Sequence, residues 1–122
     1  MPIKTLNKLY KTYSHLNIKY WKGELPPVEI EIKEIKNTFG EYFYPGAQET
    51  DCSENYKIVI NARLHWRNKS SMRNTLLHEM CHHAVFLKNK KSFWKKKMRW
   101  HGKEWKKEMR RVGFKNPILA TT

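Results

Sequence analysis

The sequence predicts an α+β fold in which a small, mostly antiparallel three-stranded sheet packs against about three helices. Two observations carry this prediction. Apolar residues recur every three or four positions near the start of the chain and again in its second half, which is the helical period. Three short runs of alternating or apolar residues lie between these segments, bounded by glycine, proline and polar residues, as strands are. Because the length of 122 residues suits a single core, we expect residues 1–122 to form one domain.

The first expected element is a helix from about Ile3 to Trp21. Lysines separate its apolar positions, so the segment is amphipathic. The apolar positions are Leu6, Leu9, Tyr10, Tyr13 and Leu16. Gly23 and the pair Pro26-Pro27 are expected to end this helix.

Three strands are expected next, at Val28–Ile35, at Phe39–Gly46 and from Tyr56 onward. The first alternates strictly between apolar and polar residues, which is the period of a half-buried strand. The second is rich in aromatic residues, and the third begins YKIVINARL. The connections between them are too short for helical crossovers, which favours antiparallel pairing.

Two helices complete the expected fold. One begins near Ser70 or Ser71, either of which can cap it, and continues to about Leu87. A basic and aromatic connection follows. The last helix is expected to begin near His101-Gly102 and to end at Gly113, since glycine commonly follows the last helical residue.

The net charge of +14 lies in the second half of the chain. Residues 1–61 hold eight lysines and eight acidic residues, whereas residues 62–122 hold 17 Lys plus Arg against three glutamates. A polyanion is the natural partner of such a segment, and nucleic acid is the commonest polyanion inside cells. Solubility alone is the other interpretation of a basic surface.

Composition also bears on the compartment. No apolar run approaches the roughly 20 residues of a membrane span, and the polar, amphipathic start lacks the apolar block of a secretory signal. The two cysteines, Cys52 and Cys81, are far apart and form no CxxC motif, so neither a disulfide framework nor a thiolate zinc knuckle is predicted. We expect a cytoplasmic or nucleoid-associated protein that does not act at a membrane.

The segment His78–His82 reads HEMCH and fits the pattern HExxH. On a helix, positions i and i+4 lie on one face, so both imidazoles can reach a single ion at about 2.0–2.1 Å. Glu79 is rotated by about 100° from His78, which places its carboxylate beside the ion as a general base and acid. The pattern therefore predicts one Zn²⁺ ion bound by His78 and His82, with Glu79 as the catalytic residue.

A catalytic zinc ion needs a third protein ligand, and the sequence offers alternatives. The metzincin continuation fails, because Val85 and Lys88 stand where glycine and histidine would be required. Glu104 and Glu108 are the downstream carboxylates. His101, at an expected helix start, is the sharper choice, and Glu104 would then support a ligand rather than bind the metal.

The other histidines are expected to have no metal role. His83 must point about 100° away from His82, so it is expected to be structural or at the surface. His15 and His65 stand alone in the sequence, and isolated histidines are usually packed or surface residues.

Taken in order, these segments resemble the SprT-like family, the zinc metalloprotease domain of the SprT and Spartan type. The resemblance rests on YWKGELPPVEI, FGEYFY, KIVIN, TLLHEMCHH and HGKEWKKEM, which span nearly the full length. It implies a minimal zincin-like fold, with His78, His82 and His101 as zinc ligands and Glu79 as the base. It also implies that substrates are DNA-associated proteins, including proteins covalently trapped on DNA, and hence DNA–protein crosslink repair.

One departure from the family concerns DNA recruitment. Many bacterial relatives carry a cysteine-rich zinc ribbon after the protease domain, whereas no cysteine follows Cys81 here. We therefore expect no C-terminal zinc ribbon, and DNA binding must come from the domain itself.

The segment Lys88–Arg111 combines cations that can neutralise phosphates with tryptophans that can stack on unpaired bases. The candidate nucleic-acid contacts are Trp94, Lys95, Lys96, Lys97, Arg99 and Trp100. Single-stranded DNA is favoured over duplex, because no groove-reading motif is present. Trp105 is a further candidate, although its i, i+4 spacing with Met109 equally fits the core of the last helix.

Two other functions remain open at this point. One is a nucleic-acid-binding module with a structural zinc ion and little activity, which would have no use for Glu79. The other is a DNA-independent protease of a regulatory protein. Tyr42 and Tyr44 are candidates for stabilising the oxyanion, and neither the natural substrate nor the oligomeric state is predicted.

Overall fold

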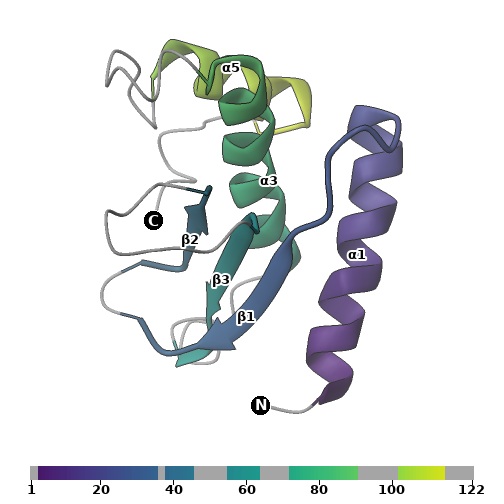
Figure 1. Ribbon diagram of the computed structural model, residues 1–122, viewed down its shortest axis with the longest axis vertical. Helices are drawn as coiled ribbons and strands as arrows, with labels where there is room; N and C mark the ends of the chain where they lie inside the picture. The colour runs from purple at the N-terminus through teal and green to yellow at the C-terminus, as the bar shows by residue number, and fades with distance from the viewer. Residues whose placement is uncertain (1–2, 36–37, 46–54, 64–71, 91–101, 115–122) are drawn as a thin grey trace.

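The computed structural model describes residues 3–35, 38–45, 55–63, 72–90 and 102–114 (Figure 1). In chain order its elements are α1 (Ile3–Trp21), β1 (Glu29–Lys33), β2 (Gly40–Phe43), β3 (Lys57–Asn61), α3 (Met72–Lys88) and α5 (Lys103–Arg111). These elements lie in the segments predicted from periodicity, so the α+β class is confirmed. None of the described helices has the length and apolar character needed to cross a membrane.

The three strands form one mixed sheet in the order β1-β3-β2. β2 pairs with β3 in the expected antiparallel direction, with Gly40 opposite Ile60. β1, however, runs parallel to β3, with Glu29 opposite Lys57. The expectation of a mostly antiparallel sheet is wrong for this pair, because β2 at the far edge returns the chain to the starting end of β1. Parallel pairing therefore needs no helical crossover here.

α1 lies beside β1 at one side of the molecule and is tied to the chain that leads into the sheet (Figure 1). The Asn17 side chain accepts a hydrogen bond from the Leu25 amide and donates one to the Leu25 carbonyl. The Tyr13 hydroxyl donates to the carbonyl of Pro26. The Ile30 amide in turn donates to the Tyr10 hydroxyl, at 2.8 Å. These bonds fix the path by which the chain enters β1.

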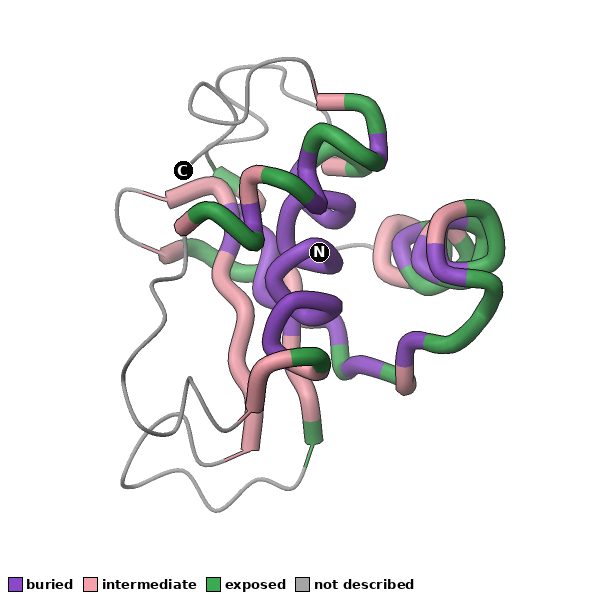
Figure 2. The backbone as a smooth tube through the Cα atoms, turned by 90° about the horizontal axis from the view of Figure 1, so that it is seen from above, coloured by how far each residue is buried: buried purple, intermediate pink, exposed green. Residues whose placement is uncertain are grey.

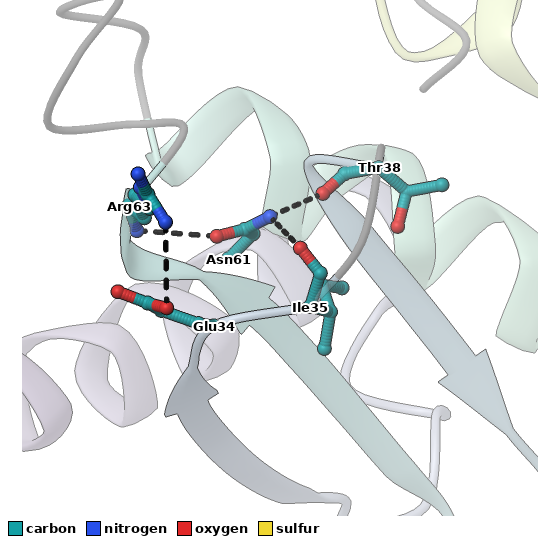
Figure 3. A network of polar contacts seen from close by, with 5 residues as sticks. All are labelled: Glu34, Ile35, Thr38, Asn61 and Arg63. Atoms are coloured by element: carbon teal, nitrogen blue, oxygen red, sulfur yellow. Dashed lines mark hydrogen bonds and ion pairs between the residues drawn. The ribbon is translucent and has the colours of Figure 1, made fainter.

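Asn61 fixes the connection that leads into β2 (Figure 3). Its side-chain amide donates to the carbonyls of Ile35 and Thr38, at 2.7 and 2.8 Å. Its side-chain oxygen accepts from the Arg63 amide at 3.1 Å. The residue is fully buried, so these bonds satisfy polar groups that have no access to water. They hold the chain just before Gly40 against the end of β3.

α3 is the centre of the core, and every residue from Thr75 to Phe86 is buried (Figure 2). A helix that is buried on all sides must be covered by neighbours on every face. α1, β2, β3 and α5 all contact it. Five of its buried residues are nevertheless polar, namely Thr75, His78, Glu79, His82 and His83. Buried polar groups need specific partners, so these residues indicate a functional site on α3.

Candidate metal centre

His78, Glu79 and His82 form a buried group on α3. Each offers one potential ligand atom, and these atoms lie within 4.8 Å of one another. The three residues are only 3–5% exposed, and the two imidazole centroids are 5.0 Å apart. Among the described residues, this is the one group of histidine, cysteine or carboxylate side chains that could hold a metal ion. Its two histidines are the pair expected from the i, i+4 spacing.

Trp105 of α5 packs directly on the two histidines. Its ring stacks on that of His82 with centroids 5.2 Å apart and planes 10° apart. It also meets the ring of His78 at 5.0 Å. Trp105 is fully buried, so its core role is confirmed and it does not offer a ring for stacking on a nucleic-acid base. α5 therefore supports the side of α3 that carries the imidazoles.

The Glu79 carboxylate lies between His78 and the start of β2. Its Oε2 atom is 3.9 Å from Nε2 of His78. A Cβ atom built on Gly40 would lie 3.2 Å from the same oxygen. Burial, assisted by the charge of Glu41, raises the pKa of Glu79 to about 8. A cation bound beside the carboxylate would oppose that shift.

His83 belongs to a different network and is structural, one of the two roles expected for it. It is fully buried, and its Nδ1 lies 2.6 Å from the Tyr42 hydroxyl. Its Nε2 lies 3.3 Å from the Pro26 carbonyl, which can only accept. Nε2 therefore carries the proton, and Nδ1 accepts from Tyr42. Burial lowers the pKa of His83 to about 4, which keeps the ring neutral.

We expect NMR of the imidazole nitrogens to show His83 neutral and protonated on Nε2 down to a pH near 4. Because this pKa lies below the ordinary value near 6.5, the associated stability is fully present above pH 6.5 and is lost as the pH falls toward 4. Tyr42→Phe should shift the Nδ1 signal, which identifies the bond. Titration of His83 at its ordinary pKa would contradict this assignment.

The two tyrosines considered for oxyanion stabilisation pack against α3 at His83 and Phe86. The Tyr42 hydroxyl engages His83, and burial raises the pKa of Tyr42. The Tyr44 ring stacks on Phe86 with centroids 4.0 Å apart. These contacts support a packing role for both side chains.

The two downstream glutamates do not belong to the His78–Glu79–His82 group. Glu108 is buried, lies 3.6 Å from the Lys88 ammonium and forms a second ion pair with Arg111. Glu104 is exposed, and both glutamates line a pocket of about 230 Å³ between α3 and α5. The described contacts therefore assign Glu108 to an ion-pair network rather than to the metal group.

Several predicted site residues lie outside the described part of the chain. His101, the proposed third ligand, is one of them. The others are the candidate nucleic-acid contacts Trp94, Lys95, Lys96, Lys97, Arg99 and Trp100. Their roles stay predictions.

An HExxH helix packed beside a small mixed sheet defines the class of minimal zincin-like folds. Within that class, the chain belongs to the SprT-like family, whose model matches residues 9–122. The resemblance noted from the motifs is thereby confirmed. No curated protein and no solved structure matched the chain.

Sequence reasoning missed the contribution of β2 to this site. A Cβ atom at Gly40 would meet the Glu79 carboxylate, and Tyr42 is hydrogen-bonded to the histidine that follows the HExxH motif. One signal was available for Gly40, because a glycine within a strand pattern often marks the close approach of another group. No comparable signal pairs Tyr42 with His83, which lies 41 residues away in sequence.

Proposed function

We propose that the protein is a zinc-dependent endopeptidase that acts on DNA-associated proteins. The observation that carries this proposal is the buried His78–Glu79–His82 group in a chain of the SprT-like family. The donor set fits zinc, because imidazole nitrogen is a preferred zinc donor and the two rings share one helix face. His78 and His82 would hold the ion. His101 is the proposed third ligand, since it directly precedes Gly102, the N-cap residue of the helix that packs on both rings.

Each protein group then has a distinct task. A zinc ion, when bound, supplies a Lewis acid that polarises the peptide carbonyl and lowers the pKa of water. The Glu79 carboxylate accepts the proton of the attacking water and delivers it to the departing amine. Trp105 holds both imidazoles in place by packing on their rings. Burial of all these side chains strengthens the electrostatic interactions among them.

The position of β2 supports an extended peptide as substrate. Among the described strands β2 lies at an edge of the sheet, and its first residue, Gly40, lies next to Glu79. Edge strands bind extended segments through backbone hydrogen bonds, which do not depend on a chain terminus. A peptide lying along β2 would pass the general base in mid-chain, as cleavage by an endopeptidase requires.

The charge of the described helices supports nucleic acid, preferably single-stranded DNA, as a partner. Seven cationic residues near the end of α3 and along α5 are exposed or half-buried. They are Lys88, Lys90, Lys103, Lys106, Lys107, Arg110 and Arg111. α5 is the helix that packs on the candidate ligands, so DNA held along it would bring associated proteins near the site. The expected contacts from Trp94 to Trp100 precede α5 in sequence.

We expect single-stranded DNA to raise the rate of protein cleavage several-fold, and added salt to remove the effect as phosphate contacts are lost. The measurement compares cleavage of a DNA-binding protein with and without DNA, using Glu79→Gln as the inactive control. Cleavage that is indifferent to DNA would instead favour a protease of regulatory proteins. Tight DNA binding without any cleavage would favour a nucleic-acid-binding module with a structural zinc ion.

A further inference from the structure

β2 and α3 meet along a matched series of contacts. Alternate residues of a strand point to the same side, and here three of them face three residues on one face of the helix. The pairs are Gly40 with Glu79, Tyr42 with His83, and Tyr44, just after β2, with Phe86. The helix positions are i, i+4 and i+7, which lie along a single stripe. We call this stripe the base face of α3.

The two histidines of the HExxH motif lie on a neighbouring face. Their rings pack on Trp105 of α5, whereas Glu79 and His83 pack on β2. α3 is therefore held from two directions by two different elements. α5 supports the candidate ligands, and β2 supports the general base. The position of the base relative to the ligands depends on how β2 sits against α3.

At Gly40 there is no room for a side chain. A Cβ atom at this position would lie 2.7 Å from Cγ2 of Thr75, 3.1 Å from the Val59 carbonyl oxygen and 3.2 Å from Oε2 of Glu79. The first distance is shorter than van der Waals contact allows, so Thr75 or the strand would have to move. Glycine weakens a strand interior, and close approach of another group is a common reason for its presence there. At Gly40 the approaching groups are Thr75, the Val59 carbonyl and the carboxylate of Glu79.

Tyr42 forms the central contact of the series. Its hydroxyl donates to Nδ1 of His83, whose Nε2 donates to the Pro26 carbonyl. The Tyr13 hydroxyl of α1 donates to the same carbonyl. The imidazole thereby ties β2 and α3 to the chain that follows α1. A hydrogen bond between buried groups fixes this spacing more strictly than apolar packing would.

We propose that Gly40 and Tyr42 are positioning residues for Glu79, which set the place of its carboxylate through the packing of β2 on α3. This inference rests on the proposed function, since it assigns residues that support the proposed base. Under this proposal β2 positions the general base and α5 positions the metal ligands. Substitutions in one element should therefore leave the groups positioned by the other unchanged.

Gly40→Ala is expected to lower kcat by about 10- to 100-fold, because a misplacement near 1 Å can cost a hundredfold. Zinc affinity should stay near that of the wild type, since His78 and His82 face Trp105. Thr75→Ser, which removes the closest atom, should restore thermal stability to Gly40→Ala without restoring kcat. Full recovery of kcat in the double variant would overturn the proposal, because the defect would then come from Thr75 alone.

Tyr42→Phe tests the second positioning residue without adding volume. It removes only the hydroxyl that bonds His83 and is expected to lower kcat while leaving zinc affinity unchanged. Tyr56→Phe is the matched control, because the Tyr56 ring also contacts His83, with centroids 4.7 Å apart. The proposal fails if Tyr56→Phe reduces kcat as much as Tyr42→Phe, or if neither changes it.

NMR of the metal-free protein tests the positioning of Glu79 without any need for catalysis, so its result does not depend on the proposed function. In the metal-free protein, the carboxyl carbon signal of Glu79, assigned with Glu79→Gln, should shift in Gly40→Ala and in Tyr42→Phe. The imidazole signals of His78 and His82 should not. This result would support positioning even if the wild type cleaved no substrate. Equal shifts of ligand and base signals would overturn the proposal, because they would show general damage to α3.

Discussion

Glu79→Gln is expected to reduce peptide hydrolysis by about 10²- to 10⁴-fold while the bound metal is retained, because general acid–base catalysis contributes that range. The amide of glutamine has nearly the shape of the carboxylate, so contact with Gly40 can be kept. It cannot accept a proton from water, which removes the proposed chemical step. The measurement is kcat for a protein substrate together with the zinc content of each purified variant.

Glu41→Gln is the matched control for this substitution. Glu41 is a neighbouring carboxylate on β2 whose charge contributes to the raised pKa of Glu79, but it does not belong to the candidate metal group. Glu41→Gln should lower the rate of peptide hydrolysis far less than Glu79→Gln does. If Glu79→Gln kept its activity, or lost its zinc, the assignment of Glu79 as a base beside the metal would be wrong.

Trp105→Ala is expected to lower the free energy of unfolding by about 3–5 kcal/mol, the usual cost of removing a large buried aromatic side chain. Trp105 is fully buried and touches both candidate ligands, so zinc binding should weaken as well. Denaturant unfolding of the metal-free protein measures the first effect. Zinc titration of the folded variant at low temperature measures the second.

Trp21→Ala is the control that separates a loss of fold stability from a loss of zinc affinity. Trp21 is also buried, at 7% exposure, but it ends α1 and its ring lies under the Arg111 guanidinium instead of on the candidate ligands. Its loss should destabilise the fold and leave the zinc affinity of the folded protein unchanged. Equal zinc affinities for the two variants would show that Trp105 has no role in holding the imidazoles.

The elements of the fold could be predicted because helical and strand periods are local properties of the sequence. The surroundings of α3 could not, since its apolar residues predict a helix but not that neighbours cover it on every side. The direction of β1 relative to β3 was also missed. Strand pairing depends on which edge β2 occupies, and the lengths of the connections between consecutive strands do not reveal that.

The candidate site, like the fold, could be predicted from the sequence only where its residues are close together in the chain. His78, Glu79 and His82 lie on one helix, so the spacing of HExxH was enough to place them together. Residues from other elements needed the tertiary structure. The sequence could not show that Trp105 packs on the imidazoles, or that buried Glu108 is already paired with Arg111 and Lys88.

Zinc titration of the wild type, His82→Ala and Glu79→Gln tests the central claim most directly, because the claim is that α3 holds a metal ion through its histidines with the glutamate beside it. We predict that the wild type binds one zinc ion per chain, that His82→Ala loses it and that Glu79→Gln keeps it. Equal zinc affinity in the wild type and His82→Ala would contradict the claim, because the ion would then be bound elsewhere.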